Sequence, residues 1–203
     1  MDTLAYIVKK YNLNLEVRSP VTIPNFGRED LATLFTELGF TKGAEIGVLL
    51  GRYSKILCEA NPKLKLYCVD PWKSYKEYKD LTPQKTFGEL YERSKALLAP
   101  FKCKLIRKKS MDAVLNFGDG SLDFVYIDGN HEFASEANDI FEWSKKVKAG
   151  GIIAGHDYRK YREKSFSHSY EVVNAYTDAY RIFHWFVTDH NKDGIRSWFW
   201  IKK

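Results

Sequence analysis

The sequence predicts an α/β protein built on a doubly wound sheet that is mostly parallel and closes with an antiparallel strand near the C-terminus. Apolar runs that suit buried strands alternate with longer segments of helical spacing from about residue 43 to about residue 183. After that point, two aromatic runs flank the turn-rich sequence DHNKDG, which is typical of an antiparallel hairpin. With 203 residues and 44% hydrophobic content, the chain can bury one substantial core and has little room for a second domain.

We expect a single domain made of an N-terminal part, residues 1–40, and a core, residues 41–203. The N-terminal part ends in a helix over Arg28–Leu38 that covers the sheet. The sequence of the first 25 residues does not indicate what they do. Core strands are expected at Ala44–Val48, Leu64–Val69, Cys103–Ile106, Asp123–Ile127 and Gly151–Ala154. Helices are expected at Tyr53–Ala60, Thr82–Leu98, Ser135–Val147 and His168–Tyr180, and the hairpin strands at Phe183–Thr188 and Ser197–Ile201.

The cysteines and the apolar runs indicate the cellular compartment to expect. Cys58, Cys68 and Cys103 are odd in number and have no paired spacing, which fits a reduced, cytoplasmic protein. The start, MDTLAYIVKKYN, lacks the apolar core of a signal peptide, and no apolar run approaches the roughly 20 residues that a bilayer span needs. We therefore expect a soluble protein with no membrane partner.

A formal net charge of +6 admits nucleic acid or acidic small molecules as partners. Basic residues are spread along the chain, with local concentrations at Lys102–Lys109 and Arg159–Lys164. The first of these alternates with apolar residues, as on a solvated sheet edge. No nucleic-acid-binding module is visible, so the sequence favours a small-molecule partner over nucleic acid.

The stretch GAEIGVLLGRYS, Gly43–Ser54, carries a short apolar strand directly into a turn with two glycines and then into a helix. Gly47 and Gly51 permit positive φ and a close approach of a ligand to the backbone. The helix offers free N–H groups to a carboxylate. The spacing is neither GxGxxG nor a phosphate loop, and two glycines alone could serve only tight packing.

The next strand ends in Asp70, 23 residues after Gly47. An acid at the tip of the second strand of such a sheet can accept hydrogen bonds from both hydroxyls of a ribose. Pro71 and Trp72 could offer a flat apolar wall to a base. Alone, Asp70 could be an ordinary turn acid, but beside the glycine turn it predicts a nucleoside pocket.

Acid and histidine pairs follow the fourth and fifth strands. Asp128 and His131 follow the fourth strand in the sequence SLDFVYIDGNHEF. His156 and Asp157 follow the fifth strand in the sequence AGGIIAGHDY. Ligands of open parallel sheets bind outside the carboxyl ends of the strands, so neighbouring strands would bring these four side chains together. A lone loop histidine is usually solvated, whereas two such pairs at corresponding strand ends indicate a functional site.

With these residues in view, the chain resembles a known family. Glu45, Gly47, Gly51 and Ser54 are similar to the first motif of class I S-adenosylmethionine (SAM)-dependent methyltransferases. The block from SLDFVYIDGNH to GGIIAGHDY resembles the branch that contains macrocin-type sugar O-methyltransferases, and the likeness runs from about Phe26 to the C-terminus. It implies a Rossmann-like sheet of seven strands in the order 3-2-1-4-5-7-6 with the last strand antiparallel, in agreement with the aromatic hairpin. Val48, Leu49 and Leu50 depart from the family by replacing an extra glycine that many members carry.

The resemblance also assigns donor-binding roles to residues at the strand tips. For the amino-acid end of SAM and its ribose these are Glu45, Gly47 and Asp70, with Gly51 and Ser54 completing the turn. For the adenine they are Trp72, Ser110 and Met111, because Ser110 ends the third strand beside the second. Asp128 could contact the methionine amino group or a metal ion.

The resemblance further implies a metal-assisted or histidine-assisted methyl transfer. In metal-dependent small-molecule O-methyltransferases, carboxylates after strands four and five hold a divalent cation, and Asp128, His156 and Asp157 stand at similar places. Oxygen ligands suit Mg²⁺, and a histidine would also admit Mn²⁺ or a related ion. The two histidines could instead merely orient the carboxylates. Methyl transfer to a hydroxyl needs aligned reactants and removal of a proton, so the expected base is His131, with His156 second.

Two loops after the second and fifth strands, Lys73–Thr82 and Tyr158–His168, are expected to choose the methyl acceptor. Their aromatic and basic residues suit a sugar or an anionic metabolite; they are Tyr75, Tyr78, Arg159, Lys160, Arg162 and Lys164. One alternative is methylation of RNA or another macromolecule, which the net charge favours but which no NPPY-type sequence supports. Another is a nucleoside-binding protein without catalysis, against which the acid and histidine pairs argue. The oligomeric state, a homo-oligomer included, stays open.

Overall fold

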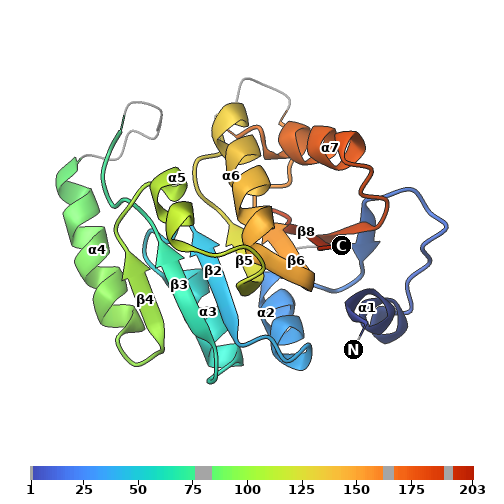
Figure 1. The fold of residues 1–203 in the computed structure, drawn as a ribbon, viewed down its shortest axis with the longest axis horizontal. Helices are drawn as coiled ribbons and strands as arrows, with labels where there is room; N and C mark the ends of the chain where they lie inside the picture. The colour runs from blue at the N-terminus through green and yellow to red at the C-terminus, as the bar shows by residue number, and fades with distance from the viewer. Residues whose placement is uncertain (1, 76–83, 162–166, 190–193) are drawn as a thin grey trace.

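The computed structural model describes residues 2–75, 84–161, 167–189 and 194–203, folded around one eight-stranded sheet (Figure 1). The strand order is β1-β7-β8-β6-β5-β2-β3-β4, and β8 runs antiparallel to both of its neighbours while the other pairs are parallel. The strands are β1 (Val21–Ile23), β2 (Lys42–Ile46), β3 (Lys65–Val69), β4 (Cys103–Ile106), β5 (Leu122–Ile127), β6 (Val147–Gly155), β7 (Trp185–Thr188) and β8 (Trp198–Ile201).

Helices cover both faces of the sheet. One face packs against α1 (Thr3–Tyr11), α2 (Arg28–Glu37), α3 (Arg52–Ala60) and α4 (Gln84–Leu98). The other packs against α5 (Ser110–Ala113), the 3₁₀ helix η1 (Val114–Asn116), α6 (Phe133–Lys146) and α7 (Ser169–Ala179). None of the helices in the described part of the chain is long and apolar enough to cross a membrane.

Strand β5 shows how one segment serves two cores. All six of its residues are buried, as expected of a parallel strand covered on both faces. Phe124 and Tyr126 point into the core under α2 and α3, whereas Val125 and Ile127 point into the core under α6 and α7. This two-residue alternation divides the apolar side chains between the two layers.

The predicted strands and their order are confirmed. Numbered as in the family, the core runs 3-2-1-4-5-7-6 from β4 through β3, β2, β5, β6 and β8 to β7. The aromatic hairpin is antiparallel, with Trp185 opposite Trp200 and Phe186 opposite Phe199. Strand β6 starts at Val147, four residues before the predicted Gly151, because the chain enters the sheet directly from α6.

The prediction of seven strands was wrong by one. Val21–Ile23 adds β1 at the edge of the sheet, where Val21 pairs with Phe186 in parallel with β7. The strand has only three residues, of which two are buried. A run this short carries too little periodicity to be recognised in the sequence. Part of the N-terminal segment thus extends the sheet, and α1 packs beside it against the same core.

The register of the strands places their ends at one edge. Ile46 pairs with Val69 on one side and with Ile127 on the other, and Ile127 pairs with Gly155. The strand order reverses between β2 and β5, which is where an open α/β sheet binds ligands. The residues that follow these strands therefore face a common space.

Candidate active site

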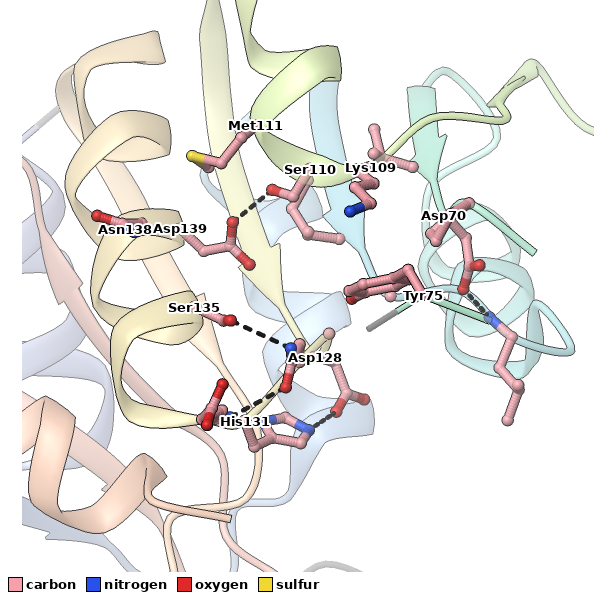
Figure 2. A pocket seen from close by; sticks show the side chains of 18 of the residues that line it. Asp70, Tyr75, Lys109, Ser110, Met111, Asp128, His131, Ser135, Asn138 and Asp139 are labelled. Carbon is pink, nitrogen blue, oxygen red and sulfur yellow. Dashed lines mark hydrogen bonds and ion pairs between the residues drawn. The ribbon is translucent and has the colours of Figure 1, made fainter. Parts of the chain in front are cut away.

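A cavity of about 840 Å³ lies over this edge of the sheet, between α5, α6 and the ends of β2, β3 and β5 (Figure 2). Most of the residues predicted for the site line it: Gly47, Asp70, Ser110, Met111, Asp128, His131 and Asp157. The remaining predicted residues, Glu45, Gly51, Ser54, Trp72 and His156, lie behind its wall.

The glycine turn is held against the neighbouring strand. Gly47 has φ of 87°, and a Cβ atom there would lie 2.0 Å from the carbonyl oxygen of Asp128. Only glycine fits both the backbone conformation and this close approach. Gly51 has φ of 73° at the start of α3 and packs near Leu98 instead of lining the cavity.

Asp70 shapes this turn as well as facing the cavity. Its Oδ2 accepts the N–H groups of Val48 and Leu49 at 3.0 and 2.9 Å, and its Oδ1 accepts the N–H of Trp72 at 2.6 Å. Burial raises the pKa of Asp70, although the three backbone N–H groups oppose the rise. The bonds also hold Leu49 in the left-handed region, with φ of 48°, where a non-glycine residue is strained.

Trp72 packs behind the turn. Its side chain is fully buried in an edge contact with Tyr91, with ring centroids 5.1 Å apart. Its indole N–H donates to the carbonyl of Leu49 at 2.8 Å. Trp72 therefore supports the strained turn from behind, whereas the sequence suggested a wall for the adenine.

Glu45 and Ser54 form a second support beneath the turn. Both are buried, and the Ser54 hydroxyl donates to the Glu45 carboxyl. Burial raises the pKa of Glu45 well above its usual range, and the bond from Ser54 offsets only part of the rise. These residues join β2 to α3 and do not reach the cavity.

The two acid and histidine pairs meet at the tips of β5 and β6. His131 Nε2 lies 2.8 Å from Asp157 Oδ2 and 3.5 Å from Asp128 Oδ1. His156 Nδ1 lies 3.3 Å from Asp157 Oδ1 and 3.6 Å from Asp128 Oδ1. We call these four residues the acid–histidine cluster; three of them line the cavity, and His156 is buried behind them.

The cluster is strongly polarised. Burial lowers the pKa of both histidines, but their bonds to the carboxyl groups outweigh it and raise the pKa of His156 to about 9 and that of His131 well above its usual value. Burial raises the pKa of Asp128 and Asp157, and the bonds to the histidines outweigh it, so both values end below the usual range. The cluster therefore favours imidazolium–carboxylate pairs.

The sequence of the chain also matches a known protein family. The model of a family described as a methyltransferase domain matches residues 44–158. The chain belongs to this methyltransferase family. No curated protein sequence matches it.

Solved methyltransferase structures share the fold of this chain. The O-methyltransferase TomG from Streptomyces achromogenes, solved in complex with SAM, is 13% identical to this chain and has a TM-score of 0.63. The match covers 100% of this chain and 91% of the TomG chain. An O-methyltransferase from Bacillus cereus, in complex with SAH, is 13% identical with a TM-score of 0.62 and the same coverage. The N-methyltransferase NodS from Bradyrhizobium japonicum is 14% identical with a TM-score of 0.52, covering 86% of this chain and 94% of its own. The fold alone therefore does not decide which atom the methyltransferase modifies.

The cluster of this methyltransferase has the donor set of a divalent metal site. Ligand atoms of Asp128, His131 and Asp157 all lie within 4.8 Å of one another in the described part of the chain. Two carboxylates and one imidazole suit Mg²⁺, Mn²⁺ or a related ion. The sequence suggested His156 as the nitrogen ligand, whereas the structure turns His131 toward the cavity.

Glu136 lies behind His131 and was not among the site residues predicted from the sequence. It is 1% exposed, its Oε2 lies 3.8 Å from His131 Nδ1, and the same oxygen accepts the Ser169 hydroxyl at 2.7 Å. The Ser169 hydroxyl also lies 3.2 Å from His131 Nδ1. Glu136 and Ser169 thus turn Nε2 of the imidazole toward Asp157.

Asp139 is another acidic residue of α6 that the sequence did not predict for the site. It lies on the inward face of α6, where its Oδ1 accepts the Ser110 hydroxyl, and it lines the cavity (Figure 2). Burial raises the pKa of Asp139 to about 7, against a smaller opposing effect of the Ser110 bond. A polar residue at a helical position usually signals a solvated face, so neither Asp139 nor Glu136 gave a sequence signal.

The two loops expected to choose the acceptor reach the cavity in part. Lys73, Tyr75, Tyr161 and Ser167 line it, and Lys109 lies 4.6 Å from the ring centroid of Tyr75. Arg159 and Lys160 lie over the rings of Tyr161 and Tyr170 and do not line the cavity. The other loop residues expected there, Tyr78, Arg162 and Lys164, lie outside the described residues.

Proposed function

We propose that this methyltransferase transfers the methyl group of SAM to a hydroxyl of a small acceptor. The observation that carries the proposal is that one cavity joins the Gly47–Asp70 turn to the acid–histidine cluster. The first supplies features that suit a nucleoside, and the second supplies groups that can take up a proton. The SAM and SAH complexes of TomG and the Bacillus cereus O-methyltransferase support the same donor.

The donor would lie along the tips of β2, β3 and β4. An ionised carboxylate offers about four lone-pair positions, and the Asp70 carboxylate uses three for backbone N–H groups. It can therefore accept one further bond, from a ribose hydroxyl. Met111 offers an apolar, polarisable surface to the base, and Asp128 would receive the amino group or help hold a metal ion.

The reaction itself is an in-line displacement. The acceptor oxygen forms a bond to the methyl carbon, the bond from that carbon to sulfur breaks, and SAH leaves as a neutral thioether. The acceptor's hydroxyl proton passes to Nε2 of His131, which faces Asp157 at the cavity wall. This step requires the neutral imidazole, and because the cluster raises the pKa of His131, we expect the neutral form and the activity to increase as the pH rises. Glu136 and Ser169 keep the ring in the orientation that this transfer requires.

In the alternative form of this mechanism, a divalent cation would be held by Asp128, His131 and Asp157, and Nε2 of His131 would then be a ligand instead of the proton acceptor. When bound, it supplies positive charge that favours ionisation of the acceptor hydroxyl. His156 contacts both carboxylates from behind and would orient them.

For the acceptor we propose a sugar or an anionic metabolite. The cavity volume of about 840 Å³ lies in the range of small-molecule sites, and a donor would fill much of it. Lys73, Tyr75 and Tyr161 supply one cation and two aromatic faces in the same cavity as the cluster. The resemblance to macrocin-type sugar O-methyltransferases supports the same class of acceptor.

The test is methyl transfer from labelled SAM to a panel of sugars, sugar phosphates, phenols and RNA. We expect turnover on at least one small hydroxyl compound and none on RNA. Turnover on RNA alone, lost steeply with added salt, would favour the macromolecule alternative. Tight SAH binding with no transfer to any hydroxyl would favour a binding protein without catalysis.

A further inference from the structure

A second cavity, of about 720 Å³, lies at the edge of the sheet opposite the candidate active site. Its walls are the C-terminal end of α7, the start of β7 and the segment that precedes β1. Trp185 lines it and begins β7, which runs in the same direction as β2, β5 and β6. The second cavity therefore lies where these strands begin, and it shares no lining residue with the cavity at their ends.

The N-terminal segment, to which the sequence assigned no role, builds one wall of the second cavity. The Ser19 hydroxyl donates to the carbonyl of Phe183 and accepts the N–H of Trp185 at 3.2 Å. Two residues later, Val21 begins the pairing of β1 with β7. Figure 1 shows this segment in blue, beside the chain that leaves α7. These bonds bring Arg18 to the same cavity as Arg181, which follows α7.

The two arginines of the second cavity have no partner within the protein. Both side chains are exposed, and neither guanidinium makes a hydrogen bond or an ion pair in the part of the chain that the structure describes. The carboxylate of Asp178, in the same lining, pairs with neither of them. Lys203 lies 5.9 Å from the ring centroid of Phe183 and adds a further positive charge. The charge around the cavity is therefore net positive.

The neutral polar side chains of the second cavity already have partners. The Asn174 amide donates to the Tyr158 hydroxyl at 3.0 Å and to the Tyr170 carbonyl at 2.6 Å. The Thr177 hydroxyl donates to the Val173 carbonyl at 2.8 Å. The guanidinium groups thus remain as donors for a ligand.

Arg181 also stands at a position that suits another residue. Its φ is 52°, in the left-handed region, directly after the last residues of α7, where glycine is the preferred residue. Its side chain is not needed to cap the helix, because backbone N–H groups already bond to the carbonyls of Tyr176, Thr177 and Asp178. An arginine that is strained and unpaired at a cavity points to a ligand.

We propose that the second cavity binds a small organic phosphate, a phosphate monoester with an aromatic or apolar body. Each guanidinium can present paired N–H groups to phosphate oxygens, and two of them match the double negative charge of a monoester. The ring of Phe183, 65% exposed, offers a stacking face for the rest of the ligand, and Ile182 and Trp185 add apolar surface. This site is separate from the methyl-transfer site and does not depend on the identity of the donor.

The experiment is a ¹H–¹⁵N NMR titration of the full chain with phenyl phosphate and with inorganic phosphate. The reporter is the indole N–H of Trp185, assigned with Trp185→Phe. The indole N–H of Trp143 donates to Ser110 at the wall of the active-site cavity and reports on binding there. We expect phenyl phosphate to shift the Trp185 signal to saturation, and inorganic phosphate to bind about threefold or more weakly because it lacks the ring.

Substitutions assign the binding to the arginines. Arg18→Gln and Arg181→Gln should each weaken phenyl phosphate binding about tenfold, because each removes hydrogen bonds between charged groups. Asp178→Asn should tighten it by about two- to fivefold, since an opposing charge is lost. Arg93→Gln, at an exposed position on α4, is the matched control and should bind like the wild type.

Arg181→Gly separates a ligand-binding role from a structural one. It should bind as weakly as Arg181→Gln, yet its thermal unfolding midpoint should rise, because glycine adopts the left-handed conformation without strain. A residue with a merely structural role would not lose binding while the fold gains stability.

Three results would overturn the proposal. One is the absence of a Trp185 shift with phenyl phosphate, or a shift of Trp143 alone, which would place the binding in the active-site cavity. Another is wild-type affinity in folded Arg18→Gln and Arg181→Gln variants. The third is equal affinity for inorganic phosphate and phenyl phosphate, which would contradict an organic ligand.

Discussion

Asp70 and Asp157 both follow strands at the same edge of the sheet, yet their surroundings are opposite. Asp70 bonds to three backbone N–H groups, and burial leaves its pKa above the usual range. Asp157 faces two imidazoles, which hold its pKa below that range despite burial. The proposed donor side is thus fixed by the backbone, while the proposed acceptor side is built from charged side chains. Changes on the two sides should therefore have separable effects.

The largest expected effect is on the acceptor side. His131→Gln removes the proposed proton acceptor, and loss of a general base typically costs about 10² to 10⁴ in rate. SAH affinity should change by less than about twofold, because the donor side is untouched. Calorimetry and single-turnover assays measure the two quantities. His184→Gln, at an exposed position before β7, is the control and should turn over normally. Equal loss of donor affinity and rate in His131→Gln would contradict the separation.

The next effect tests the donor side through the backbone. Gly47→Ala places a Cβ atom 2.0 Å from the Asp128 carbonyl at φ of 87°, so it should lower the free energy of unfolding by about 3 kcal/mol or more. Gly88→Ala is the matched control, since an added Cβ there meets nothing within 4 Å in α4. It should raise stability by about 0.5 to 1 kcal/mol. Urea unfolding measures both, and a neutral Gly47→Ala would mean that the turn is not constrained.

A pH effect of similar size is expected from Asp139. Its folded pKa of about 7 exceeds the value of about 4 expected in the unfolded chain. Stability from this group is present below pH 4 and is lost as the pH rises toward 7, on the order of 3 kcal/mol. His131 and Glu136 act on this pKa in opposite directions, the imidazolium lowering it and the carboxylate raising it.

Asp139→Asn removes the titration, so the variant should match the wild type in stability near pH 4 and exceed it near pH 8. Thermal unfolding across this range measures the difference. A constant difference at all pH values would place the Asp139 pKa in its usual range.

Most of the sheet and the meeting of the strand-end residues could be predicted from the sequence. The alternation of strands and helices predicted β2 to β8, since buried parallel strands are nearly continuous apolar runs. It also predicted that residues 128, 131, 156 and 157 would meet, because parallel strands end at one edge. β1 was missed because three residues carry too little pattern.

Side-chain direction is the part that could not be predicted. His131 and His156 both follow strands, and which ring faces the cavity depends on loop geometry, including Asp157 in the left-handed region at φ of 59°. Trp72 also has positive φ, 41°, which turns its ring behind the wall. Asp139 and Glu136 look like surface acids until α6 is docked onto the sheet.

A smaller effect tests the metal on the acceptor side. Removal of divalent cations should lower turnover at least about tenfold, since the ion would stabilise the ionised acceptor oxygen. The fold should persist, because the two apolar cores do not involve the cluster. The assay compares chelated enzyme, verified free of metal, with enzyme restored by Mg²⁺ or Mn²⁺. Full turnover without metal would leave proton transfer to His131 as the whole mechanism.

The most direct test of the separation between the two sides is SAH calorimetry on Asp70→Ala and His131→Gln, each verified as folded by thermal unfolding. The account predicts about tenfold or greater loss of SAH affinity in Asp70→Ala, since a bond from a ribose hydroxyl to a charged group contributes roughly 1.5 to 3 kcal/mol. It predicts wild-type affinity in His131→Gln. Unchanged SAH affinity in a folded Asp70→Ala variant would contradict the proposed donor site.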